Sequence, residues 1–285
     1  MTSFAPILLV ALSLLDSRPN APAPQPPAEA QAASTPSTAE ERYLAELRQR
    51  AARGDIEAEV AIGNLYESGQ SVLPLDPAQA AGWYRRAADK GHVGAQINLA
   101  VMSLDGYGVR RDAVQAVAWY RKAADRGDAL AQFSLGSIYE TGLDGIARDV
   151  AVAAEWYRKA AEQGLVSAQY RLGELFREGR GVRRDREQAI AWLRKAADQG
   201  DANAQIELGI LLCPGHATSD DLVEAHTWLN LAASRWKDEG QRLRAASLRD
   251  ALAETMTSAQ LAEAYRRATV WQDAHAWRRE SRPAR

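Results

Sequence analysis

Apolar and polar positions follow a helical period along most of this chain, and the pattern recurs at a nearly fixed interval. In one copy, apolar side chains stand at offsets 0, 4, 7 and 8 from Ala131, which places them on one stripe of an α-helix. The same stripe begins again at Ala58, Ala168 and Ala204. Each of these segments therefore predicts an amphipathic helix with one buried face.

A second apolar stripe, centred on a tryptophan, follows each first stripe. Runs of the type Trp-Tyr-Arg-Lys-Ala-Ala begin at Trp83, Trp119, Trp156 and Trp192, with a fainter copy at Trp228, at intervals of 36, 37, 36 and 36 residues. This period, in a sequence rich in helix formers, predicts stacked helical hairpins that bury their apolar faces on one another. Alanines share the tryptophan face, so we expect the indoles in the core. The alternative, an aromatic ligand cage, needs rings that converge on one point.

Aspartates mark the predicted starts of the second helices. An aspartate stands seven residues before each tryptophan, at Asp76, Asp112, Asp149, Asp185 and Asp221. A carboxylate there can cap the free N–H groups of a helix start and suits the positive end of the helix dipole. A catalytic role is disfavoured because nothing reactive repeats beside these aspartates.

Glycines also recur inside the first helix, at Gly63, Gly136, Gly173 and Gly209. Their recurrence predicts a neighbouring group too close for a Cβ atom.

Composition and charge narrow the classes of function. The formal charge of −2 provides no basic surface for nucleic acid. Cys213 is the only cysteine, which excludes intrachain disulfides and a thiolate zinc site, and we expect it to be a small buried apolar side chain. Basic pairs after each tryptophan are followed four residues on by acids, as at Asp89 and Asp125. They predict a solvated face. An anion-binding stripe is the alternative, which the interleaved acids weaken.

The N-terminus lies outside the repeats. Residues 1–17 contain an apolar run from Phe4 to Leu15 that is too short to span a bilayer but fits a signal peptide, although no Lys or Arg precedes it and Pro6 interrupts it. Residues 18–39 are rich in Pro and Ala and predict a disordered linker. We expect export, with no membrane span after cleavage of the signal. A cytoplasmic chain that keeps its N-terminus is the alternative.

The full pattern consists of Ala-x-x-x-Leu-Gly-x-x-Tyr, a glycine-containing loop, Asp, and then Ala-x-x-Trp-Tyr-x-Lys-Ala-Ala-x-x-Gly. It resembles the Sel1-like repeat of the tetratricopeptide-like superfamily. Five copies fill residues 55–240, at about 58–94, 95–130, 131–167, 168–203 and 204–240. The resemblance implies an all-α fold, a right-handed α-solenoid of stacked helix-turn-helix repeats. Residues 40–54 would form an N-terminal capping helix, residues 241–278 C-terminal capping helices, and residues 279–285 a basic tail.

The resemblance also implies a non-enzymatic scaffold or adaptor that needs no cofactor and binds a protein or peptide, in the periplasm or secreted from a bacterial cell. A cytoplasmic regulatory adaptor is the alternative. If the geometry follows tetratricopeptide repeats, the first helices line a concave face. They would then expose the following candidate protein-binding residues: Glu59, Asn64, Gln96, Gln132, Gln169 and Gln205.

An enzyme is the competing class. One Sel1-like subfamily is associated with β-lactam binding and hydrolysis, and Ser234 and Lys237 form a Ser-x-x-Lys motif here. No Ser-Asp-Asn or Lys-Thr-Gly accompanies that motif, and the subfamily is cysteine-rich, so we interpret the match as chance. The histidines His92, His216, His226 and His275 are far apart and predict no metal site.

Overall fold

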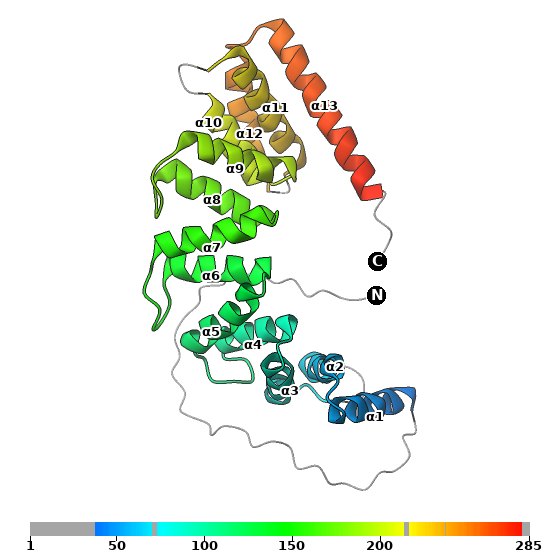
Figure 1. Cartoon of the computed structure of the whole chain (residues 1–285). Helices are drawn as coiled ribbons and strands as arrows, with labels where there is room; N and C mark the ends of the chain where they lie inside the picture. The colour runs from blue at the N-terminus through cyan, green and yellow to red at the C-terminus, as the bar shows by residue number, and fades with distance from the viewer. Residues whose placement is uncertain (1–37, 70–72, 214–216, 237, 281–285) are drawn as a thin grey trace.

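The computed structural model describes residues 38–69, 73–213, 217–236 and 238–280, and within them the chain is an all-α solenoid (Figure 1). The predicted fold class is confirmed. The helices are α1 (Ala39–Ala52), α2 (Ile56–Ser68), α3 (Pro77–Asp89), α4 (Val93–Asp105), α5 (Ala113–Asp125), α6 (Ala129–Thr141), α7 (Val150–Glu162), α8 (Val166–Glu178), α9 (Arg186–Asp198), α10 (Ala202–Leu212), α11 (Ser219–Arg235), α12 (Glu239–Ala253) and α13 (Ser258–Glu280). The predicted signal peptide, linker residues 18–37 and the end of the tail lie outside the described residues.

Five hairpins form the stack, each with a first and a second helix: α2–α3, α4–α5, α6–α7, α8–α9 and α10–α11. Each second helix packs on its own first helix and on the first helix of the next hairpin. Helix α1 covers the start of the stack on α2, while α12 and α13 both pack on α11 at the other end (Figure 1). None of the described helices is both long and apolar enough to cross a membrane.

The repeated aspartates start the second helices, with one exception. Asp76, Asp112, Asp149 and Asp185 are N-caps whose carboxylates accept bonds from backbone N–H groups one turn on. The prediction is wrong for Asp221, because α11 begins earlier and Thr218 is its N-cap. Asp221 instead completes a capping box, in which its side chain accepts from the Thr218 backbone N–H. The last hairpin therefore has a longer second helix than the others.

The inner glycines let a ring or branched side chain of the second helix lie against the first helix. A Cβ atom on Gly136 would come within 2.6 Å of the Tyr157 ring, and one on Gly209 within 2.7 Å of Leu229 Cγ. The prediction of a close neighbour is thus confirmed, and that neighbour is a side chain. The residue after the tryptophan (Tyr84, Tyr157, Leu193 or Leu229) fills this place in four hairpins, and the second hairpin has Ala100 at the glycine position.

Four of the five repeat tryptophans belong to the core, as predicted, whereas Trp83 in the first hairpin is only partly buried. Trp119, Trp156 and Trp192 are each at most 9% exposed. A lysine three residues on lies over the ring, with Lys122 Nζ 3.8 Å from the centre of the Trp119 ring. The same contact recurs at Trp156 and Trp192. Each indole therefore packs inside the stack and holds a cation at its surface, a contact that adds about 0.5–1 kcal/mol at exposed sites.

Candidate functional site

Five of the six predicted contact residues are buried. Glu59, Gln96, Gln132, Gln169 and Gln205 occupy one register of the first helices and are at most 5% exposed. The expectation that these side chains face solvent is wrong. The four glutamines lie where a first helix meets the second helix of the preceding hairpin, and Glu59 faces the second helix of its own hairpin. These side chains are therefore not available to a partner in this structure.

These glutamines complete the hydrogen bonding of the preceding helix end. Gln169 Nε2 donates to the Ala161 carbonyl oxygen at 3.1 Å, and Gln199 Nε2 donates to Gln169 Oε1 at 2.8 Å. The last carbonyl groups of a helix lack partners within the helix, so a side-chain donor there is stabilising. In the first hairpin the register holds Glu59, whose carboxylate pairs with Arg86 and Lys90, both at 3.0 Å. The glutamines therefore join consecutive hairpins, whereas Glu59 joins the two helices of the first hairpin.

Asn64 is the sixth predicted residue, and it is exposed. The Tyr84 hydroxyl oxygen lies 2.6 Å from Asn64 Oδ1 and 2.6 Å from Glu67 Oε2. Tyr157 makes a similar contact in the third hairpin, where its hydroxyl donates to Glu140 Oε2 at 2.8 Å. Burial, together with the adjacent Glu140 carboxylate, raises the pKa of Tyr157. These tyrosines bring a polar atom to the surface of the first helices.

A network of charged side chains continues along this surface in the later hairpins. Arg180 links Glu140 at 3.1 Å with Glu178 at 3.2 Å, which bridges α6 and the end of α8. Further along, Glu207 of α10 lies 3.7 Å from Arg177 of α8 and 4.0 Å from Arg244 of α12. Exposed pairs of this kind add little to stability. They do give the first-helix surface a defined pattern of alternating charge.

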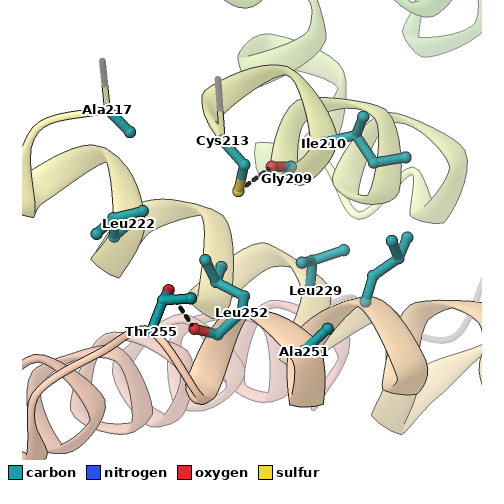
Figure 2. A pocket seen from close by; sticks show the side chains of 10 residues that line it. Gly209, Ile210, Cys213, Ala217, Leu222, Leu229, Ala251, Leu252 and Thr255 are labelled. Atoms are coloured by element: carbon teal, nitrogen blue, oxygen red, sulfur yellow. Dashed lines mark hydrogen bonds between the residues drawn. The ribbon is translucent and has the colours of Figure 1, made fainter. Parts of the chain in front are cut away.

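An apolar pocket opens at the end of the stack, between α10, α11 and α12 (Figure 2). It has a volume of about 610 Å³. Its walls include Gly209 and Ile210 from α10, Leu229 from α11 and Leu252 from α12. The thiol of Cys213 lies at its edge, and the residue is exposed, so the expectation of a buried cysteine is wrong. Sequence reasoning did not find this pocket, because α12 lies outside the repeat.

The residues considered for catalysis are described only in part. Ser234 is exposed, and its hydroxyl donates to the Leu231 carbonyl oxygen at 2.9 Å. Lys237, the other half of that motif, lies outside the described residues. Over the described ranges, no group of three or more His, Cys, Asp or Glu side chains is placed to hold a metal ion. The described residues therefore do not test the Ser-x-x-Lys motif.

Comparison with known proteins identifies the repeat. A profile described as the Sel1 repeat matches residues 56–92, 93–128, 129–165, 166–201 and 202–235. The structure is similar to a Sel1 repeat protein from Oxalobacter formigenes at 30% identity and a TM-score of 0.62, covering 69% of this chain and 80% of that chain. It is also similar to a protective antigen of uropathogenic Escherichia coli with an SLR fold (24% identity, TM-score 0.40, 85% and 67% covered). A comparison with curated proteins finds no match.

Proposed function

Because the chain belongs to the Sel1 repeat family, we propose that it is a non-enzymatic scaffold that binds a protein or peptide partner on the surface of its first helices. Sel1 repeat proteins typically mediate protein–protein interaction. The observation that carries the proposal is the division of positions within each repeat. The residues that recur are buried in packing and capping, as Gln132 and Trp156 are, while the exposed first-helix positions differ from one hairpin to the next.

The first-helix surface is suited to recognition. The exposed second position of the first helices changes from Glu57 to Leu130 to Asn203, and the charged network from Glu140 to Arg244 adds a fixed pattern of charge. Charge patterning of this kind steers association and excludes partners with the wrong charge. Exposed apolar side chains such as Leu130, which is 52% exposed, would supply buried contact area in a complex.

Site-specific photo-crosslinking in cells tests this function. A photoreactive residue would replace Leu130 or Asn203 on the first helices and, as matched controls, the exposed Ala118 or Ala191 on the second helices. We expect adducts of one defined mass from the first-helix sites and none from the controls. Adducts at equal yield from both sets, or from neither, would contradict the proposal.

We also propose that the scaffold acts in the cell envelope after export. The apolar run from Phe4 to Leu15 and the Pro-rich segment after it support this location. Fractionation followed by N-terminal sequencing of the mature protein tests it. A mature chain that starts after about residue 17 in the periplasm or medium supports export, whereas a cytoplasmic chain that begins at Met1 or Thr2 supports the regulatory adaptor instead.

A further inference from the structure

The apolar pocket of Figure 2 lies at the position that a tyrosine ring fills against the inner glycine of the first and third hairpins. In the first hairpin, the Tyr84 ring lies against Gly63, and its hydroxyl reaches Asn64 and Glu67. The residue after the tryptophan in the last hairpin is Leu229, which lies against Gly209 in the same way. A leucine side chain ends where the outer half of a tyrosine ring would begin.

The neighbours of that place have changed as well. Counting from the inner glycine, Asn64 corresponds to Ile210, and Glu67 corresponds to Cys213. Both Ile210 and Cys213 line the pocket. The fourth hairpin also has a leucine here, Leu193, but keeps the charged residues Glu174 and Arg177 at the two neighbouring positions. The fifth hairpin lacks both the ring and the polar groups that receive its hydroxyl. Helix α12 closes the opposite side with Leu248 and Leu252. The result is an apolar pocket of about 610 Å³ with the dimensions of a ligand site.

Two polar groups in the pocket wall already form hydrogen bonds with backbone carbonyl oxygens. Cys213 Sγ lies 3.0 Å from the Gly209 carbonyl oxygen, and Thr255 Oγ1 donates to the Leu252 carbonyl oxygen at 2.8 Å (Figure 2). A polar small molecule would find few free groups here to orient it. An apolar side chain needs none, because burial of its surface provides the attraction.

We propose that this pocket binds a phenylalanine side chain of the partner protein. The phenylalanine ring would lie at the position that Tyr84, Tyr120 and Tyr157 occupy in the first three hairpins. The inference rests on the proposed scaffold function and names the anchor of its partner. A single aromatic anchor in a desolvated pocket is the kind of contact that dominates an interface. Phenylalanine is favoured over tyrosine because Ile210 offers no partner for a hydroxyl.

The affinity of the pocket for the side chain can be measured directly with the full chain. The probes are N-acetyl-phenylalanine amide and N-acetyl-tyrosine amide, titrated while methyl NMR signals of Ile210, Leu248 and Leu252 are followed. We expect saturable shifts with a Kd on the order of 1 mM for the phenylalanine probe and at least about threefold weaker binding of the tyrosine probe. No saturable shift, or tighter binding of the tyrosine probe, would overturn the assignment.

A variant that fills the pocket provides the matched test. In Leu229→Phe the new ring would lie over Gly209 as Tyr84 lies over Gly63, so the fold has a precedent for it. We expect binding of the phenylalanine probe to weaken at least about tenfold. Ala251→Glu, which places a charge in the pocket wall, should act in the same way if the ring disturbs folding. Ala191→Glu, at an exposed position of α9, should leave probe binding unchanged.

Crosslinking separates this inference from the scaffold function. If a partner is captured from Leu130 or Asn203 and Leu229→Phe leaves its yield unchanged, the scaffold stands and the anchor assignment is wrong. If the probe binds but no first-helix site captures a partner, the scaffold function fails. A photoreactive residue at Ile210 provides a further test. If it reacts only with residues 214–216 of the same chain, or with a second copy, the pocket belongs to this chain and the proposal is overturned. A fall of about tenfold in the yield of one partner in Leu229→Phe, with full yield in Ala191→Glu, supports it.

Discussion

The substitution Gln169→Glu tests whether the recurrent glutamine is a buried cap. The side chain is 4% exposed, and its amide nitrogen donates to the Ala161 carbonyl oxygen at 3.1 Å. Glutamate keeps the size of the side chain but replaces this donor with a carboxylate oxygen that faces a carbonyl oxygen. The change therefore removes one hydrogen bond and places a negative charge in a buried position.

The magnitude follows from these contacts. The lost hydrogen bond is worth about 1 kcal/mol, and the Ala161 oxygen keeps the bond from the Gly164 N–H. Burial of a carboxylate with one donor left, from Gln199, adds about 2 kcal/mol or more. We expect the free energy of unfolding to fall by about 3 kcal/mol at pH 7. Burial also raises the carboxyl pKa above its unfolded value of about 4.3, so the loss is full above the folded pKa and shrinks as the pH falls toward 4.

The first hairpin shows what would restore the variant. Glu59 occupies this register with Lys90 at 3.0 Å, and Gln199 stands in the fourth hairpin where Lys90 stands in the first. The double variant Gln169→Glu with Gln199→Lys should therefore recover about 1–2 kcal/mol, while Gln199→Lys alone should be nearly neutral. A coupling energy of at least about 1 kcal/mol would identify the pair.

Urea unfolding followed by circular dichroism measures these differences. Because a repeat array can unfold in parts, amide hydrogen exchange in α8 and α9 should locate the loss in the fourth hairpin. A loss below about 0.5 kcal/mol in Gln169→Glu would refute the buried cap, since an exposed carboxylate has no such cost. The absence of coupling with Gln199→Lys would refute the equivalence of the two hairpins.

Three further predictions concern stability. Gly136→Ala should destabilise the chain by about 2 kcal/mol, because the new Cβ would meet the Tyr157 ring. Gly82→Ala, in open space on α3, should stabilise the chain by about 0.5–1 kcal/mol. Equal effects of the two variants on thermal unfolding would contradict this contrast. Asp185→Ala should cost about 1 kcal/mol through loss of the N-cap of α9, and unchanged urea unfolding would argue against the cap. Burial and the positive charge of Arg249 lower the pKa of His226, so the unfolded chain takes up the proton first and stability should fall as the pH drops below about 6.5. His226→Leu should remove that dependence, and a variant that keeps it would assign the titration elsewhere.

The candidate site was less predictable than the fold. Glutamine is usually exposed, and the register of Gln96 and Gln132 predicted a solvent-facing row by analogy with tetratricopeptide repeats. Only the position of the preceding helix end shows that these side chains are enclosed. The recurrence of glutamine in four of the five hairpins was the signal that could have corrected the prediction, because recurrent positions belong to the scaffold.

The pocket was not predictable for a different reason. That Leu229 stands where the first three hairpins have tyrosine, and the fourth has Leu193, is visible in the sequence. Whether the smaller side chain leaves a space depends on α12, which follows no repeat pattern and packs on α11 in place of another first helix. A change of side chain opens a pocket only where the surrounding helices do not close over it.

The sequence by itself determined the all-α solenoid, the buried tryptophans, most of the helix starts and the close approach at the inner glycines. Each of these depends on the local period and on end-capping chemistry, which a repeated pattern records many times over. The tertiary structure decided that Gln169 caps a neighbouring helix, that Cys213 is exposed and that the last hairpin ends in an open apolar pocket. Those features depend on which helix lies against which, and a recurrent residue in the chain does not by itself identify the helix that it contacts.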